Sequence, residues 1–255
     1  YKSVVDINVI ADKAICYDVV TNIEGLAENH QKKIDLNLNK SVSNMADRFI
    51  IKDEIELSSG KPNIREILQS NIDISNQDVR VSNGKVTVTG ELVITILYKG
   101  DSDDSVIEFL ENEVPFNGVI DIQEVREDMF ANVLLNLQDK YIQVKQDSDG
   151  EDRVIDIEVS LGAIVRVNTQ ESVEVLEDAY CINKKLSMER SNISYPKLIC
   201  RNKNQSNIKE IIQLDNNSPD ILQIFRGKGK SHLDDVKVVN DKVIVEGVIE
   251  TDILY

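Results

Sequence analysis

The stretch that decides the fold is Val81–Tyr98, "VSNGKVTVTGELVITILY", and the chain carries it twice. The last eighteen residues, Val238–Tyr255, read "VVNDKVIVEGVIETDILY". When the comparison begins at Asp78 and Asp235, 11 of 21 positions are identical. Both copies are rich in Val and Ile and alternate between apolar and polar residues, which is typical of β-strands. The sequence therefore predicts a repeated β module.

Each copy has a turn signal between two alternating runs. Asn83-Gly84 predicts a two-residue hairpin turn of type I′, in which both central residues adopt positive φ. The second copy has Asn240-Asp241 at this place, which is a weaker but allowed turn sequence. We therefore expect a β-hairpin in each copy.

A glycine interrupts the second strand of each copy, Gly90 in the first and Gly247 in the second. Glycine inside a strand packs no side chain and usually marks a bulge, a bend or a close backbone approach. Both copies then end in Ile-Leu-Tyr, at Tyr98 and Tyr255. We interpret the stretch as a long strand that bends at Gly90 and passes from a half-exposed sheet into a buried position.

The apolar run Leu92–Tyr98 has high β propensity, no charge and no Pro. An exposed strand of this kind would template pairing with another chain. It is therefore either buried in its own sheet or used to bind another strand by β-augmentation.

Two further blocks recur in the same order. "NIREILQ" (63–69) matches "NIKEIIQ" (207–213), and "VVDINV" (4–9) matches "VIDIEV" (154–159). The spacing of about 150 residues suits a domain and is too long for a solenoid unit. The chain therefore holds more than one domain but fewer than two complete ones.

We expect residues 1–40 to be the back part of a preceding repeat, 41–190 a complete repeat and 191–255 the front part of a following one. Because the first residue is Tyr and not Met, we expect a piece of a longer protein. The register of the ends also allows neighbouring chains to complete each other head to tail, as in a filament.

The predicted fold class is mainly β, with tandem β-sandwich or barrel-like repeats of about 150 residues and one or two short helices in each. One helical turn or two are predicted over 62–69, because Pro62 is tolerated in a first turn and the apolar residues after it share one face. Residues 124–142 are ambiguous between helix and strand, and we predict helix as far as Leu135.

The composition narrows the function classes. The net charge of −16 and the absence of a basic stripe argue against nucleic acid as a partner. No run of 18 apolar residues exists, so we expect no membrane insertion. Cys16, Cys181 and Cys200 form no metal or disulfide pattern; we expect reduced cysteines, with cross-linking between subunits as the alternative.

We find no catalytic constellation and predict a protein that is not an enzyme and needs no cofactor. His30 and His232 lie in polar surroundings without a nucleophile or ligand at a motif spacing, so we expect both on the surface.

The acidic stretch "DSDGED" (147–152) loosely resembles a calcium loop, with Asp147, Asp149, Glu151 and Glu158 as candidate ligands. Its Gly falls at the fourth place and not the sixth, and its flanks read as strands. We expect a solvated hairpin turn, with calcium as the alternative.

Several motifs, taken in order, resemble the SPOCS domain of Firmicute spore-envelope proteins. The motifs that carry the resemblance are Pro62–Leu68, Val81–Tyr98, Val114–Phe116 and Val173–Tyr180. They are structural motifs, so the resemblance identifies a family better than an activity.

The resemblance implies a role in the mother cell, at the forespore surface or in the spore coat. Family members with tandem SPOCS repeats and a LysM module act with a coat-basement ATPase, so other coat proteins and this ATPase are the implied partners. Self-association is a further expected contact, and it rests on the register of the ends. We recognise no LysM-like segment here, so the resemblance assigns the ATPase contact to no residue.

The leading interpretation is a non-enzymatic scaffold for protein–protein contacts in coat morphogenesis. The first alternative is a β module that binds glycan or peptidoglycan, although the absence of Trp leaves few stacking surfaces. The second is a subunit of a self-assembling layer or filament on the spore surface.

Overall fold

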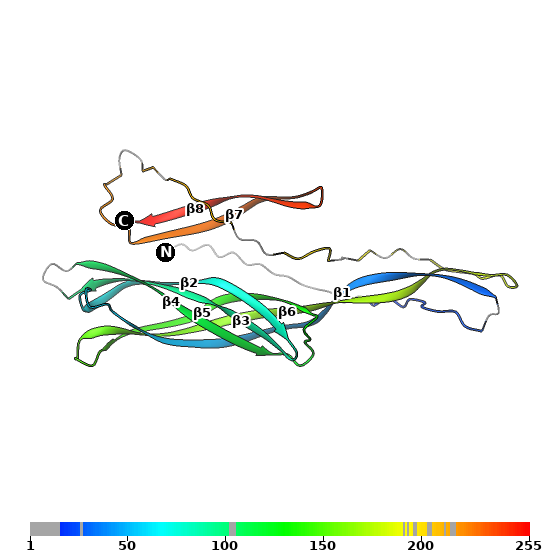
Figure 1. Ribbon diagram of the computed structural model, residues 1–255, viewed down its shortest axis with the longest axis horizontal. Coiled ribbons are helices and arrows are strands. Elements are labelled where there is room, and N and C mark those ends of the chain that lie inside the picture. Colours follow the sequence, from blue (N-terminus) through cyan, green and yellow to red (C-terminus); the bar gives the residue numbers. More distant parts are fainter. Residues whose placement is uncertain are drawn as a thin grey trace, which may run out of the picture. The chain divides into compact units, whose positions relative to one another are not determined.

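The computed structural model contains eight strands and, over the residues it describes, no helix (Figure 1). The described residues are 16–25, 28–101, 106–190, 192, 194–195, 198–202, 206–211, 213–214 and 218–255. In chain order the strands are β1 (Asn29–Glu56), β2 (Ile64–Ser82), β3 (Lys85–Gly100), β4 (Ile107–Asp121), β5 (Phe130–Gln146), β6 (Asp152–Cys181), β7 (Arg226–Val239) and β8 (Lys242–Leu254). The mainly β prediction is confirmed.

The strands form two three-stranded sheets and one hairpin. One sheet has the order β1-β6-β5, the other has the order β2-β3-β4, and β7 pairs with β8. The pairs β2–β3, β3–β4, β5–β6 and β7–β8 are antiparallel. Short connections between consecutive strands allow this pattern, because antiparallel neighbours need only a tight turn.

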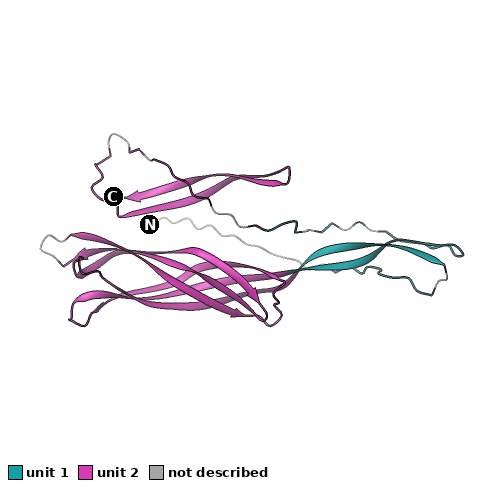
Figure 2. Ribbon diagram, in the orientation of Figure 1, with its two compact units in different colours: residues 1–40, 169–201 teal, residues 41–168, 202–255 magenta. Residues whose placement is uncertain are grey.

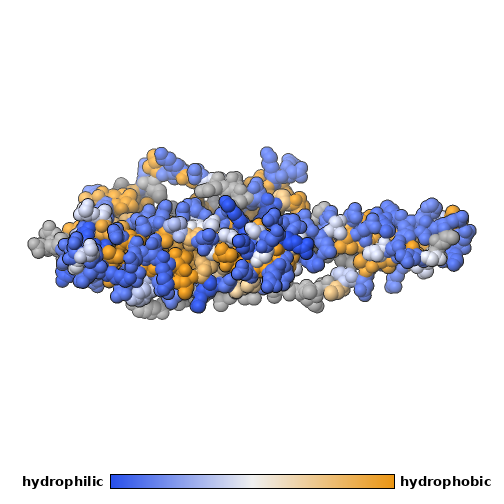
Figure 3. Space-filling view, turned by 60° about the horizontal axis from the view of Figure 1, so that its bottom comes forward, coloured by the Kyte–Doolittle hydropathy of each residue, from blue (hydrophilic) through white to orange (hydrophobic). Residues whose placement is uncertain are grey.

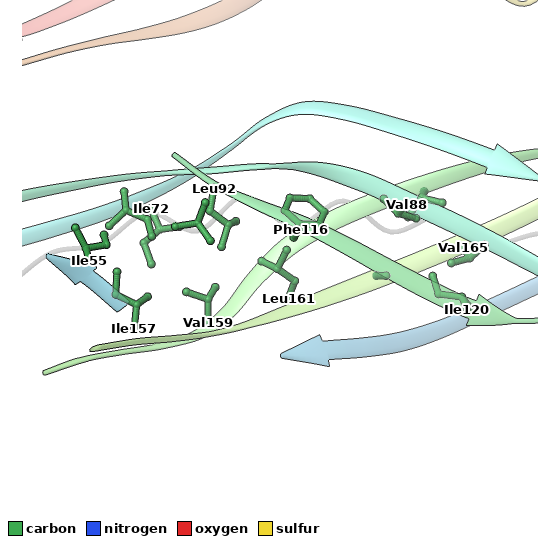
Figure 4. Close-up of a cluster of buried hydrophobic side chains, with 14 of the residues drawn as sticks. Ile55, Ile72, Val88, Leu92, Phe116, Ile120, Ile157, Val159, Leu161 and Val165 are labelled. Atoms are coloured by element: carbon green, nitrogen blue, oxygen red, sulfur yellow. The ribbon is translucent and has the colours of Figure 1, made fainter. Parts of the chain in front are cut away.

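The two three-stranded sheets pack face to face as a β-sandwich. Figure 4 shows Leu92 and Phe116 of the β2-β3-β4 sheet facing Val159 and Leu161 of β6. All four side chains belong to one apolar core cluster. Burial of such alternating side chains from both inner faces supplies most of the favourable free energy of a sandwich.

The chain divides into two compact units (Figure 2). Unit 1 comprises residues 1–40 and 169–201, and unit 2 comprises 41–168 and 202–255. Unit 2 contains the sandwich core. Unit 1 contains the first part of β1 and the last part of β6, and surface ion pairs such as Lys33–Glu174 at 2.8 Å link them there. The predicted division into three repeat parts stays a prediction.

The helix predicted over 62–69 is wrong, because β2 begins at Ile64 and pairs with β3. Register shifts between Ile64 and Glu66, and between Ile67 and Gln69, explain the misleading pattern. A β-bulge changes which residues share a face, so Ile64 and Ile67 both reach the core although they are three apart. Bulged strands can thus imitate helical spacing.

The helix predicted from residue 124 to Leu135 is also wrong. Turns occupy the first part of this segment, and β5 begins at Phe130. Ala131 and Val133 are buried, whereas Leu134 between Val133 and Leu135 is 64% exposed. This alternation has the period of a strand, and pairing with β6 satisfies its backbone groups.

The interpretation that β3 passes from a half-exposed to a buried position holds for only one of its two faces. Val86 and Val88, which precede Gly90, are as fully buried as Leu92 and Ile96, which follow it. One face of β3 therefore points into the core along its whole length. The more apolar sequence after Gly90 reflects additional burial on the other face, where Thr95 is also buried.

Candidate functional site

The β7-β8 hairpin repeats the β2-β3 hairpin in its backbone pairing. Val238 pairs with Val243, and Val81 pairs with Val86 at the matching place. The pairing of Val236 with Val245 likewise matches that of Val79 with Val88. The sequence repeat is therefore also a structural repeat.

The two hairpins differ in burial. Val86, Val88 and Leu92 are each 0% exposed in the sandwich. The residues that match them in β8 are Val243, Val245 and Ile249, and these are 59%, 63% and 53% exposed. We call the side formed by Val236, Val238, Val243, Val245 and Ile249 the hairpin face. Its side chains have the core pattern, but the described residues do not cover them.

Most of the protein surface is hydrophilic. Figure 3 shows hydrophilic residues over most of the surface in this view, with apolar residues in separate patches among them. Single exposed apolar residues are normal on a folded protein, whereas a contiguous apolar face marks an interaction surface. The hairpin face is therefore the main candidate for function in this chain.

Each hairpin has a bulge opposite its strand glycine. In β2–β3 the register shifts between Ser75 and Asp78, close to Gly90, and Asn76 has a φ of 49°. In β7–β8 the shift lies between Leu233 and Asp235, and Leu233 pairs with Gly247. The glycines therefore mark equivalent irregular points.

Gly90 also makes room for an aromatic ring. A Cβ atom on Gly90 would lie 2.6 Å from Cζ of Phe116, which is its cross-strand neighbour. The Phe116 ring fills the space on the core face that a side chain at position 90 would take, and it packs on Phe49 with ring centroids 5.9 Å apart. The missing side chain is thus part of the core packing.

The type I′ turn predicted at Asn83-Gly84 is wrong, because only Gly84 has positive φ, at 78°. A tertiary contact fixes this turn: Gly84 N–H donates to the carbonyl of Val125 at 2.8 Å, and Ile122 N–H donates to the carbonyl of Gly84 at 2.9 Å. At Asn240-Asp241 both residues have positive φ, 48° and 62°, as a type I′ turn requires. At this second turn the described residues show no such tertiary hydrogen bond, and the turn follows the local rule.

Tyr98 closes one end of the sandwich. Its hydroxyl donates to the carbonyl of Pro62 at 3.3 Å. Burial raises the pKa of Tyr98 to about 12, and the negative charge of Glu108 adds to the rise while Arg153 opposes it. The phenol is therefore a neutral, buried structural group. Its counterpart Tyr255 is partly exposed.

Arg153 holds the loop between β1 and β2 against β6. Its Nη1 donates to the carbonyl of Lys61 at 2.9 Å and to Oδ1 of Asn63 at 2.8 Å. Its Nη2 donates to the carbonyl of Ser58 at 2.7 Å. A guanidinium has enough N–H groups to satisfy several carbonyls at once. The role of Arg153 is therefore to fix this loop.

The other candidate residues lie apart from one another. His30 and His232 are exposed, and His232 Nε2 lies 3.3 Å from a carboxylate oxygen of Glu250. Cys181 is buried, whereas Cys16 and Cys200 are exposed. No single site collects these side chains.

The acidic turn is held by hydrogen bonds from its backbone N–H groups to the side chain of Asp147. Oδ1 of Asp147 accepts the N–H groups of Asp149 and Glu151 at 2.9 and 3.0 Å. Glu158 pairs with Lys52 at 2.7 Å, so it does not join the turn as a ligand. Within the described ranges, no group of three His, Cys, Asp or Glu side chains could hold a metal ion.

A family model matches both hairpins. The SPOCS domain of SipL matches residues 63–145 and 220–255, which include β2, β3 and β4 in the first copy and β7 and β8 in the second. This chain is a SPOCS-domain protein. It resembles SipL, and the SPOCS match makes it a sporulation-related protein. Searches of curated proteins and of solved structures found no significant match.

The SPOCS match gives the hairpin comparison a family context. The match ends inside β5 in the first copy and resumes just before β7. The repeated sequence block at 4–9 lies outside the match and outside the described residues. In the part of the chain that the structure describes, no helix has the length and apolar character needed to span a membrane.

Proposed function

We propose that this chain is a non-enzymatic structural protein of the bacterial spore envelope that mediates protein–protein contacts in coat morphogenesis. It acts at the forespore surface, on the side of the mother cell, and its partners are other coat proteins. The SPOCS match supports the link to sporulation. The proposed role in protein–protein contacts is supported by the exposed apolar side chains of the hairpin face.

The observation that carries the proposal is the hairpin face. Val238 is 77% exposed and Val245 63% exposed, although the same positions of the first copy belong to the sandwich core or pack against it. Exposed apolar faces are unfavourable in water, and covering one on association releases free energy in proportion to the area removed from water. A protein that keeps such a face is suited to assembly.

Long strands add a second supporting feature. β1 extends over 28 residues and stands at the edge of its sheet. Lys side chains along it, including Lys33, Lys40 and Lys52, form ion pairs with acidic residues of β6. Charged side chains on an edge strand discourage indiscriminate pairing with other strands. The sheet edge is thus protected, while the hairpin face is open.

A localisation experiment in the spore-forming parent organism tests this proposal. We expect a fluorescent fusion of the protein to encircle the forespore, and we expect deletion of the gene to leave the coat detached. The fluorescent protein alone, expressed from the same promoter, is the control. A fusion that stays diffuse in the mother cell throughout sporulation, with a normally attached coat in the deletion strain, would contradict the proposal.

A further inference from the structure

Thr95 is buried on the outer face of the β2-β3-β4 sheet. It is 6% exposed, although the alternation of β3 points it away from the sandwich core. A cavity of about 10 Å³ lies beside it, and Thr95 and Leu97 of β3 line this cavity together with Arg226 and Leu254 of the β7-β8 hairpin. The outer face of the first copy therefore lies against the hairpin of the second.

The two copies meet through the same positions of the repeat. Leu254 stands at the place that Leu97 occupies in the first copy. Arg226 pairs with Leu254 across β7 and β8 as Gln69 pairs with Leu97 across β2 and β3, and all four residues line the cavity. Surfaces of the same kind meet in this way in two-fold contacts. The arrangement is a back-to-back contact of two related sheets.

The cavity has a buried polar group from each copy. Within the described part of the chain, Oγ1 of Thr95 and Nε of Arg226 are buried and have no hydrogen-bond partner. A space of this size with polar groups on both sides suits one bridging water. A water at this place would join the two copies at the centre of their contact.

The contact also brings opposite charges together. Lys228 Nζ lies 3.1 Å from Oδ1 of Asp73. Arg226, Lys228 and Lys230 share this side of β7 and give it three positive charges. On the sheet, Asp73 and Glu111 are cross-strand neighbours of outward-facing positions of β3. Exposed ion pairs add little affinity, but complementary charge selects one partner and one orientation.

We propose that the outer face of the β2-β3-β4 sheet is a docking surface for the following repeat of the same chain, and that β7 docks there by its basic side. Leu254 and Ile249 are on opposite sides of β8, so the hairpin face takes no part in this contact. Docking of one repeat on the next restricts the motion that a linker alone would allow between them. The inference goes beyond the proposed function, because it concerns how repeats are joined within one chain.

Carbodiimide cross-linking of the 255-residue chain measures this contact. The reagent joins a Lys amine to a carboxylate in direct contact with it, and mass spectrometry of the digested protein identifies the linked peptides. We expect a link between Lys228 and Asp73. The positive control is Lys145, which lies 3.0 Å from Glu54 and from Asp156 within the β1-β6-β5 sheet. A digest with the Lys145 link and without the Lys228 link overturns the proposal.

A matched pair of variants shows whether the basic side of the hairpin makes the contact. Leu254→Glu places a carboxylate in the contact beside Leu97, and Ile249→Glu places one on the hairpin face. Both side chains are partly exposed, at 39% and 53%, so neither change disturbs the sandwich core. Because a covered carboxylate without a partner is unfavourable, we expect Leu254→Glu to lower the yield of the Lys228–Asp73 link by more than about tenfold. Ile249→Glu leaves this yield within about twofold, since surface changes have small effects. Equal yields in the two variants overturn the proposal.

A mixture of unlabelled and isotope-labelled protein shows whether the contact lies within one chain. We expect Lys228–Asp73 links only between peptides that carry the same label. Links between unlike labels at the random share mean that the hairpin docks on another chain, and they overturn the proposal. The localisation experiment is independent of this result. A fusion that encircles the forespore, combined with a missing Lys228 link, removes the docking surface and leaves the coat role intact, whereas a diffuse fusion combined with the link does the reverse.

Discussion

The β2-β3 hairpin and the β7-β8 hairpin have related sequences and the same pairing register, but only the first is covered. Val88 lies in the core at 0% exposure, and Val245 at the matching position is 63% exposed. Both hairpins have a bulge opposite a glycine. Strand pairing and the bulge are thus properties of the local sequence, whereas burial depends on the opposing sheet.

The largest expected difference between the two hairpins is the cost of removing a core side chain. Leu92→Ala leaves a cavity in the sandwich and lowers the free energy of unfolding by about 2–5 kcal/mol. Ile249→Ala, at the matching exposed position, changes it by less than about 0.5 kcal/mol. Urea unfolding at a concentration where the chain is monomeric measures both. Similar losses for the two variants would mean that the hairpin is already buried in the monomer.

Gly90 offers the next largest effect. Gly90→Ala places a Cβ against the Phe116 ring and destabilises the sandwich by about 1–3 kcal/mol, as overpacked cores do. Gly60→Ala is the matched control, because nothing lies within 4 Å of its added Cβ and its φ is not positive. Thermal unfolding of the two variants checks this expectation.

A double variant sharpens the test of Gly90. Phe116→Leu shortens the side chain that the new Cβ meets, so its combination with Gly90→Ala is less destabilising than the sum of the two single changes. Strict additivity would show that the ring does not cause the effect.

Arg153 is a feature of the sandwich whose loss should have a moderate effect. Arg153→Ala leaves the carbonyls of Ser58 and Lys61 without this partner and costs about 1–3 kcal/mol. The control is Arg80→Ala, because Arg80 is exposed and pairs with Asp78 in a surface ion pair worth less than about 1 kcal/mol. Unfolding in guanidinium chloride measures the free energy of unfolding of both variants. Equal effects would refute the role of Arg153 in holding the loop.

The smallest effect concerns Tyr98 at alkaline pH. Since the folded-state pKa of about 12 lies above the ordinary value of 10.0, the unfolded chain loses its phenol proton first as the pH rises. The contribution of Tyr98 to stability is therefore fully present below pH 10 and is lost as the pH rises through 12.

Tyr98→Phe removes this dependence. Between pH 9 and pH 12 we expect the urea midpoint of the wild type to fall further than that of Tyr98→Phe, with Tyr255→Phe as the control that behaves like the wild type. Parallel curves for Tyr98→Phe and the wild type would show that the phenol is not buried.

Much of the fold could be predicted from the sequence, because the alternation around Val86 and Val88 and the recurrence at Val243 and Val245 are local signals. The helix predicted over 62–69 failed because a bulge near Ile64 disguises the strand period. The turn type at Gly84 failed for a different reason: its hydrogen bonds to residues 122 and 125 are tertiary. Local patterns contain no information on such contacts.

The candidate site was harder to predict than the fold. The sequence indicated that Gly90 and Gly247 are special, but it could not show that Phe116 fills the space beside Gly90. It also could not show which copy of the apolar pattern is covered, because burial is a property of two layers and not of one strand. The hairpin face became visible only when the same positions were compared in both copies.

Hydrogen–deuterium exchange of β3 and β8 at low and high protein concentration tests the central claim most directly. Amides of β3 lie in the sandwich core, so we expect slow exchange at both concentrations. Amides of β8 should exchange fast at low concentration, because the hairpin face is exposed, and more slowly when association at high concentration covers this face. Equally slow exchange in both strands at low concentration, or fast exchange of β8 at every concentration, would contradict the account.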